Sequence, residues 1–270
     1  MPISSQSNRA IKLIRSLRSR KDRERAGLFF VEGIRIVGEA AQLGADIQEL
    51  VVAPQLLTSP FGREIVEAHK RAGVPCLEVT AEVFKSISLK EGPPGIGALV
   101  RPRWEPLETV SLSSELGWVA LDAVQDPGNL GSILRTSDAV GGAGVILIEH
   151  TTDPYDPAAV RASMGAIFSQ RLVRASLAQF ADWKRRHQVF VVGTSGSAST
   201  DYQAIAYRPP LVLFMGSERL GLSDEQQALS DVMVSIPMVG RSDSLNLAVA
   251  TGLILYEIFN QRRAAVKHGA

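Results

Sequence analysis

The first hundred residues alternate short apolar runs with segments whose apolar positions recur at helical spacing. "LFFVEGIRIVGEAAQLG" predicts a strand entering a helix, and "DIQELVVAP" and "PCLEVT" predict further strands. Between these two, "FGREIVEAHKRAG" predicts a helix that ends at Gly73. A short helix, "AEVFKSIS", and a turn leading into a strand, "EGPPGIGALVRP", follow. This pattern predicts a compact α/β domain of roughly a hundred residues.

The second half of the chain has a different pattern, in which apolar strands alternate with segments of helical length. Its strands are apolar on consecutive positions: "WVALDAV", "VILIE", "QRLVRA", "VFVVGT", "LVLFMG" and "VMVSIPM". Such strands indicate a mostly parallel sheet covered on both faces. Between the halves, a stretch rich in Pro, Ser and charge shows no period. We therefore expect a domain over 1–104, a linker over 105–116 and a second α/β domain over 117–270.

Composition narrows the class of protein. The chain has 270 residues, 45% hydrophobic and 21% charged, as in a globular protein with a real core. The single cysteine, Cys76, excludes an internal disulfide framework, and four scattered histidines show no metal-ligand spacing. No apolar run reaches the length of a membrane span, and residues 1–27 do not resemble a secretory signal. We expect a cytoplasmic protein without a metal or a membrane partner.

Positive charge is concentrated at the N-terminus. Residues 1–27 carry eight Lys and Arg against two acids, a local charge of +6, whereas the remainder carries −5. A basic arm on a mildly acidic body predicts a polyanionic partner. The alternative is a solvated face of an amphipathic helix, because Ile11, Ile14 and Leu17 recur at helical spacing beside the charges.

Several familiar functional motifs are absent from the sequence or incomplete. The chain has no G-x-x-x-x-G-K-[ST] phosphate loop, and "GGAG" at 141–144 follows a helix, the reverse of a dinucleotide fingerprint. "GTSGS" at 193–197 has Ser197 where a nucleophile elbow has its second glycine, so a polar loop after a strand is favoured.

Three other segments share one design, an apolar strand followed by a loop rich in Gly, Ser, Asn and Glu. They are "LDAVQDPGNLGSILR", "LVLFMGSERLGLS" and "VSIPMVGRSDSLNLAVATGLILYEIF". In an open parallel sheet, ligands bind where such loops gather at the carboxyl ends of strands. Each polar residue also has a structural alternative: Asn129, Ser244 and Asn246 as helix caps, Glu218 as a helix-dipole partner and Arg135 as a surface charge.

Taken together in this order, the segments resemble the three motifs of the SpoU (TrmH) family of RNA ribose 2′-O-methyltransferases. "DPGNLGSILRTSDAVG", "MGSERLGLS" and "SIPMVGRSDSLNLAVATGLILYE" match motifs one, two and three, and "VRASMGAIF" matches a helical segment between the first two. "FFVEGIRIVGEA" resembles the accessory RNA-binding domain common in that family. Motif two departs from the usual G-x-E-G-x-G, since Arg219 and Leu220 follow Glu218.

The resemblance implies a SPOUT fold, in which the C-terminal segment of a parallel-sheet domain forms a deep trefoil knot, and a homodimer whose interface includes the last helix. The apolar circumference of "LNLAVATGLILYEIF" is compatible with such an interface, and burial within one chain is the alternative. S-adenosylmethionine would lie in the knot, held mainly by backbone groups. The expected contacts are Thr194, Gly216, Ile236, Met238, Leu245 and Asn246.

The resemblance also implies roles in catalysis. Arg135 matches the motif-one arginine that the family is thought to use on the hydroxyl; because guanidinium scarcely deprotonates, a phosphate clamp that stabilises charge is the easier role. Asn129 would orient the ribose or Arg135, Glu218 would fix neighbouring polar groups, and Ser244 and Asn246 would shape the motif-three loop. The candidate RNA contacts are Arg9, Lys12, Arg15, Arg18, Arg35, Arg161 and Ser163.

The expected function is an S-adenosylmethionine-dependent RNA 2′-O-ribose methyltransferase acting on ribosomal RNA of the 23S type. Transfer RNA as the substrate and a non-catalytic RNA-binding assembly factor are the alternatives. The co-occurrence of all five catalytic candidates argues against the assembly factor. A small-molecule methyltransferase is disfavoured by the basic N-terminus and the extra domain.

Overall fold

A computed structural model describes residues 1–110 and 116–268, and shows two compact units. Unit 1 comprises residues 1–102 together with 155–168, and unit 2 comprises 103–154 and 169–270. Residues 111–115 of the expected linker lie outside the described residues. The part of the linker on either side is folded into unit 2, because Leu107, Val110 and Leu116 are buried there.

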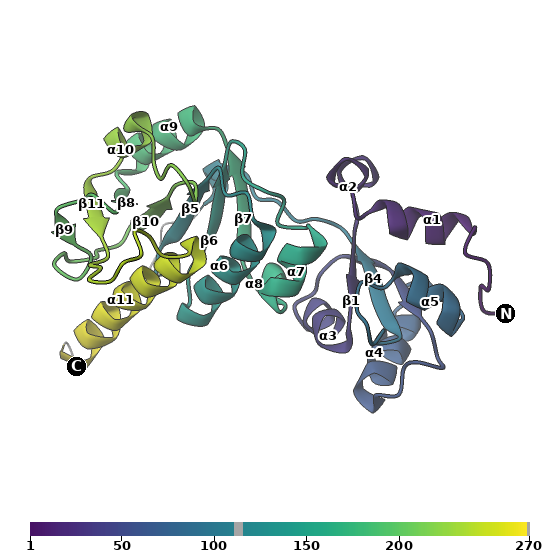
Figure 1. Ribbon diagram of the computed structural model, residues 1–270. Coiled ribbons are helices and arrows are strands. Elements are labelled where there is room, and N and C mark those ends of the chain that lie inside the picture. Colours follow the sequence, from purple (N-terminus) through teal and green to yellow (C-terminus); the bar gives the residue numbers. More distant parts are fainter. Residues whose placement is uncertain (111–115, 269–270) are drawn as a thin grey trace. The chain divides into compact units, whose positions relative to one another are not determined.

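Unit 1 is built on a mixed sheet whose strand order is β1-β4-β2-β3 (Figure 1). Only β2 and β3 pair in parallel, and β4 runs antiparallel to both of its neighbours. The strands and helices expected from "LFFVEGIRIVGEAAQLG" to "EGPPGIGALVRP" are confirmed. In chain order the elements are α1 (Arg9–Ser16), α2 (Arg20–Ala26), β1 (Phe29–Glu32), α3 (Ile34–Gln42), β2 (Ile47–Val52), α4 (Pro60–Arg71), β3 (Cys76–Glu78), α5 (Ala81–Ile87) and β4 (Ile96–Val100).

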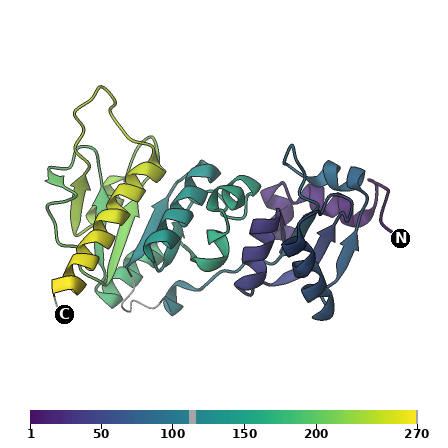
Figure 2. The same cartoon turned by 90° about the horizontal axis from the view of Figure 1, so that it is seen from below.

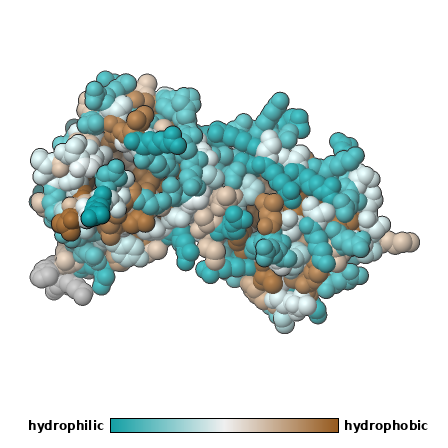
Figure 3. Space-filling view, in the orientation of Figure 1, coloured by the Kyte–Doolittle hydropathy of each residue, from teal (hydrophilic) through white to brown (hydrophobic). Residues whose placement is uncertain are grey.

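The basic N-terminal residues are part of this unit's core. α1 buries Ile11 and Ile14, and Leu17 follows them into a cluster with residues of β2, α5 and β4. The expectation of an arm is therefore wrong, and the amphipathic helix is what the sequence folds into. Its apolar positions return every three or four residues, so one side enters the core and the charges stay outside. Figure 3 shows hydrophilic side chains over the region where Figure 1 places α1 and α2.

A segment from the second half of the sequence completes unit 1. It contains α7 (Pro157–Ser163) and the start of α8 (Ala166–Ser169). The ring of Phe29 in β1 contacts the rings of Tyr155 and Phe168, with centroids 4.6 and 6.3 Å apart. Asp156 forms an ion pair with Arg23 of α2 at 3.4 Å. Residues 155–168 therefore fold with unit 1, although the sequence pattern assigns them to the second domain.

Unit 2 contains a seven-stranded sheet in which every pairing is parallel, in the order β7-β6-β5-β10-β8-β11-β9. The six expected strands are confirmed, and the two-residue β9 is added. After η1 (Leu107–Thr109), the elements are β5 (Trp118–Asp122), α6 (Pro127–Val140), β6 (Gly144–Ile148), β7 (Arg171–Ala175), α9 (Leu177–His187), β8 (Phe190–Thr194), β9 (Thr200–Asp201), β10 (Leu211–Met215), α10 (Asp224–Ala228), β11 (Val232–Ser235) and α11 (Leu247–His268).

Helices cover both faces of this sheet, as consecutive apolar positions require. On one face, Phe180 and Trp183 of α9 join Trp118 of β5 and Phe214 of β10 in a buried cluster. On the other, α6 and α11 lie side by side over the sheet in both ribbon views (Figures 1 and 2). No described helix is long and apolar enough to cross a membrane.

Candidate active site in unit 2

The first site residue lies just inside the N-terminus of α6. Asp126 caps this helix: its Oδ1 accepts hydrogen bonds from the backbone N–H groups of Gly128 at 2.6 Å and Asn129 at 3.4 Å. Pro127 occupies the first turn, where its missing N–H is harmless. Because Asp126 supplies the cap, the interpretation of Asn129 as the cap is wrong, and the Asn129 amide is available for other partners.

The Asn129 side chain joins the loops of all three motifs. Its Nδ2 donates to Glu218 Oε1 of motif two at 3.3 Å, and its Oδ1 accepts from Asn246 Nδ2 of motif three at 2.9 Å. The other oxygen of Glu218 accepts from the backbone N–H of Gln125 at 3.3 Å. Three of the five catalytic candidates thus form one hydrogen-bonded network.

Asn246 has a second role at the start of α11. Its Oδ1 accepts from the backbone N–H groups of Ala248 at 2.9 Å and Val249 at 3.2 Å, so it caps the helix while its Nδ2 reaches Asn129. Ser244 is exposed, and its hydroxyl contacts only the neighbouring Asp243 carboxylate at 3.4 Å among the described residues. Of the two expected caps, Asn246 is therefore the one used.

Motif two forms a tight turn after β10. Ser217 and Gly221 exchange backbone hydrogen bonds of 3.0 and 3.2 Å, which brings the chain back over Gly216. A Cβ on Gly216 would lie 2.2 Å from the carbonyl carbon of Gly221, so only glycine fits there. The departure from the usual motif lies at the tip of this turn, where the Leu220 side chain is 91% exposed. Gly221 itself has a φ of +66°, as the turn requires.

The loops after β8, β10 and β11 enclose a cleft of about 410 Å³ at the carboxyl ends of these strands, and the motif-one loop is not part of its lining. Five expected cofactor contacts line it: Thr194, Gly216, Ile236, Met238 and Leu245. Asn246 does not line the cleft and reaches it only through the network. Other apolar residues of the lining were not predicted from the sequence; they lie at or after the ends of strands and on α11: Met215, Leu222, Val234, Leu247, Ala250 and Ile254.

Arg135 lies farther along α6 and is exposed. In the described part of the chain its guanidinium has no hydrogen-bond or ion-pair partner. Arg135 comes six residues after Asn129. In an α-helix this spacing moves a side chain roughly 9 Å along the axis and about 240° around it beyond one full turn. A single chain therefore does not bring Arg135 into the Asn129 network.

Asp122, at the end of β5, is a site neighbour that the sequence pattern did not predict. The residue is 8% exposed; its Oδ2 accepts from Gln226 Nε2 at 2.6 Å, while its Oδ1 is buried without a partner among the described residues. Burial raises the pKa of this carboxyl above its ordinary value, and the Gln226 hydrogen bond opposes the rise. The available signal was an acid ending the otherwise apolar run "WVALD".

The candidate RNA contacts all belong to unit 1. Arg9, Lys12, Arg18, Arg35 and Arg161 are exposed. Arg15 is half-buried and donates to Gln6 Oε1 and Ser86 Oγ. Ser163 is fully buried, and its hydroxyl donates to the Val160 carbonyl at 2.8 Å, so its prediction as an RNA contact is wrong in this conformation.

Comparison with known proteins matches both units to families. Residues 118–256 match the model of the SpoU rRNA Methylase family, and residues 8–98 match an MRM3-like substrate binding domain. The 23S rRNA (uridine(2479)-2′-O)-methyltransferase of Streptomyces viridochromogenes is 33% identical, over 91% of this chain and 87% of that protein. The 23S rRNA (guanosine(2553)-2′-O)-methyltransferase of Bacillus subtilis is 28% identical, over 95% and 98%.

A solved structure is similar over nearly the whole chain. The crystal structure of an AdoMet-bound rRNA methyltransferase from Sinorhizobium meliloti superimposes with a TM-score of 0.88 at 38% identity, over 96% of this chain and 97% of that one. The match spans both units, and the family model covers the segments that hold Asn129, Glu218 and Asn246. The chain belongs to the SpoU rRNA Methylase family.

Proposed function

We propose that this protein transfers a methyl group from S-adenosylmethionine to a ribose 2′-hydroxyl of 23S-type ribosomal RNA. The observation that carries the proposal is the Asn129–Glu218–Asn246 network, which joins the loops of motifs one and three to Glu218 in the lining of the cleft. Both relatives with 23S rRNA in their names cover most of this chain. The substrate binding model matched by unit 1 also supports an RNA substrate.

The cleft offers the kinds of groups that the cofactor needs. The close approach of the chain at Gly216 and Gly221 leaves backbone groups, with no side chain between them, facing a flat ligand. Thr194, Ile236, Met238 and Leu245 would hold the adenosine and methionine parts against apolar walls. When bound, the cofactor supplies a cationic sulfonium methyl group.

The chain's own residues position and stabilise the attacking hydroxyl. A ribose hydroxyl is a weak nucleophile and must lose its proton as the new bond forms. Both Glu218 oxygens already accept hydrogen bonds, so this carboxylate fixes Asn129 and Gln125 in place. The Arg135 guanidinium clamps an RNA phosphate and stabilises negative charge developing on the 2′-oxygen; it does not act as the base.

Arg135→Ala tests this assignment. We expect it to abolish methyl transfer and to leave cofactor affinity within about tenfold, or roughly 1.4 kcal/mol, because Arg135 is outside the cleft lining. Calorimetry with S-adenosylmethionine, run beside turnover, separates the two effects. Arg208→Ala, at another exposed arginine of unit 2, is the matched control and should retain turnover. Loss of both binding and turnover in Arg135→Ala would assign Arg135 a structural role.

The RNA target is identified by offering both substrate classes. Unmodified ribosomal and transfer RNA are incubated with labelled S-adenosylmethionine, and nuclease fragments are analysed by mass spectrometry. One added methyl on a ribose of 23S rRNA is the expected result. Methylation of transfer RNA alone would select that alternative, and methylation of neither RNA would favour the assembly factor.

A homodimer and the trefoil knot belong to the same proposal. Val249, Leu253 and Tyr256 recur at helical spacing on α11, and all three are exposed. Figure 3 shows hydrophobic surface where Figure 1 places α11. A second copy against this helix would cover the stripe and bring a second Arg135-bearing helix with it, since α6 lies beside α11. Light scattering should give twice the chain mass of 29.1 kDa.

We place the enzyme in the cytoplasm, where its proposed substrate is made.

A further inference from the structure

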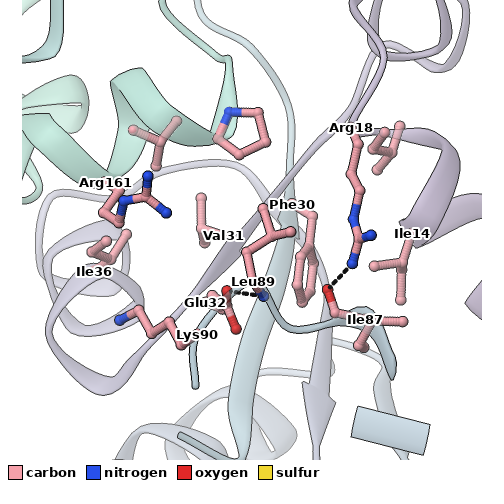
Figure 4. Close-up of a pocket in the computed structure, with 13 residues that line it drawn as sticks. Ile14, Arg18, Phe30, Val31, Glu32, Ile36, Ile87, Leu89, Lys90 and Arg161 are labelled. Atoms are coloured by element: carbon pink, nitrogen blue, oxygen red, sulfur yellow. Dashed lines mark hydrogen bonds between the residues drawn. The ribbon is translucent and has the colours of Figure 1, made fainter. Parts of the chain in front are cut away.

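Unit 1 contains a cleft that methyl transfer in unit 2 does not use. It lies between α1, β1, the start of α3, the loop after α5 and α7, and all of its lining belongs to unit 1. Figure 4 shows Arg161 and Lys90 on one side, Arg18 on the other, and Phe30 with Leu89 between them. Cations therefore surround an apolar centre.

The three cations are placed for an external anion. Arg18 is fixed by a 3.1 Å hydrogen bond from its Nη2 to the Ile87 carbonyl, which leaves its other N–H groups available. Lys90 and Arg161 are exposed, and within residues 1–110 and 116–268 neither side chain has an ion-pair or hydrogen-bond partner. Like charges gathered at one opening raise the local potential for a polyanion.

Glu32, the acid in the lining, is already engaged. Its carboxylate accepts from Ser88 Oγ at 2.5 Å and from the Leu89 backbone N–H at 2.7 Å. It therefore holds the 88–90 loop in place and presents Leu89 and Lys90 to the opening. The lining carries three positive charges against this one negative charge.

The centre of the cleft is apolar and partly open. Phe30 is half-buried, and Leu89 is 47% exposed, a large fraction for a leucine beside a pocket. The enclosed space is about 40 Å³, too narrow for a duplex or for two stacked bases. The edge of a single planar ring is what it accommodates.

From this arrangement we infer that the unit 1 cleft binds one unstacked nucleotide of the RNA substrate. The edge of its base enters between Phe30 and Leu89, and the flanking phosphates lie among Arg18, Lys90 and Arg161. Single-stranded RNA is recognised in this way, through bases splayed onto aromatic and apolar side chains with cations on the backbone. The inference rests on the proposed RNA substrate, but it concerns binding and not methyl transfer.

Photo-crosslinking on the full chain tests the base contact. The probe is a bacterial 23S rRNA transcript in which 4-thiouridine replaces uridine, and crosslinked peptides are mapped by mass spectrometry. We expect crosslinks to the peptides that contain Phe30 or Leu89. Crosslinks confined to other surfaces of unit 1 would overturn the inference.

Charge reversal tests the phosphate contacts. Lys90→Glu with Arg161→Glu should weaken binding of a labelled single-stranded RNA by about tenfold or more and reduce the salt slope by roughly 0.7 for each phosphate that is no longer neutralised. A duplex of the same sequence should be affected less. The matched control is Lys85→Glu with Arg71→Glu, two exposed cations of unit 1 outside the cleft. Equal reductions of affinity in both double variants would overturn the inference.

Turnover separates failure of the cleft from failure of the proposed function. A wild-type protein that crosslinks at the cleft but methylates no RNA would contradict the methyltransferase proposal alone. A Lys90→Glu, Arg161→Glu variant that binds and methylates RNA like wild type would contradict the cleft alone. Thermal melting of each variant checks folding, and the wild-type crosslink requires no substitution.

Discussion

Unit 1 buries the charged side chain of Arg23, and unit 2 buries those of Asp122 and Asp153; Arg23 and Asp122 differ in how fully their polar atoms are partnered. Arg23 in unit 1 is 3% exposed; its guanidinium donates to the carbonyls of Leu17 and Arg18 and pairs with Asp156. Asp122 in unit 2 is similarly buried but leaves one oxygen without a partner in the described part of the chain. A fully partnered charge supports a fold, whereas an incompletely partnered buried charge is typical of a functional region.

The largest effect should come from deleting residues 1–27. The deletion removes Ile11, Ile14 and Leu17, and truncating each such side chain costs about 2–5 kcal/mol against a typical total stability of about 5–15 kcal/mol. We expect unit 1 to unfold. The chain's single cysteine, Cys76, reports this, since it lies in β3 and burial raises the pKa of its thiol.

Reaction of Cys76 with a thiol reagent should therefore be slow in the full chain and fast after the deletion. The reaction rate of Cys76 in the full chain unfolded by denaturant gives the upper limit. A deletion variant that reacts slowly and loses only RNA affinity would restore the basic-arm interpretation.

Arg23→Ala should have the next largest effect. It leaves Asp156 and two carbonyls without their donor, and breaking a buried ion pair costs about 3–5 kcal/mol. Arg20→Ala is the matched control, because its pair with Glu24 is half exposed and is worth at most about 1 kcal/mol. Urea unfolding compares them. Equal losses of unfolding free energy would show that the partners of Arg23 do not matter.

Asp122→Asn should produce a smaller, pH-dependent effect. The folded-state pKa is raised, so the folded protein holds the proton to higher pH than the unfolded chain does. Wild-type stability therefore falls as pH rises from about 4 through the folded-state pKa. The amide introduced by the substitution cannot ionise. The unfolding free energy of the variant minus that of wild type should therefore increase with pH over that window and stay constant above it.

Denaturant unfolding at a series of pH values provides this measurement. Glu149 and His150 also act on the Asp122 carboxyl, the first raising and the second lowering its pKa, so His150→Gln is the control for the effect of His150. A difference between Asp122→Asn and wild type that stays constant with pH would show that Asp122 does not carry the effect.

Pattern alone predicted the elements of unit 1 from β1 to β4 and six of the seven strands of unit 2, because burial period and strand-end chemistry are local. It also predicted that Asn129, Glu218 and Asn246 belong to one site, since loops after parallel strands meet at one edge. It could not separate Arg23 from the exposed arginines around it, because burial of a cation depends on Asp156, 133 residues away. Asp126 and Asn129 lie within one helical turn of each other. A sequence pattern does not locate the start of a helix this finely, so it could not choose Asp126 over Asn129 as the cap of α6.

The discontinuity of unit 1 constrains how this chain can be recombined with a relative. Residues 155–168 are encoded between β6 and β7, yet they supply the partners of Phe29 and Arg23. A recombination event that exchanged only the first hundred residues between relatives would leave those partners behind. Unit 1 therefore depends on a segment encoded within the sequence of unit 2, and changes in one piece must be matched by changes in the other.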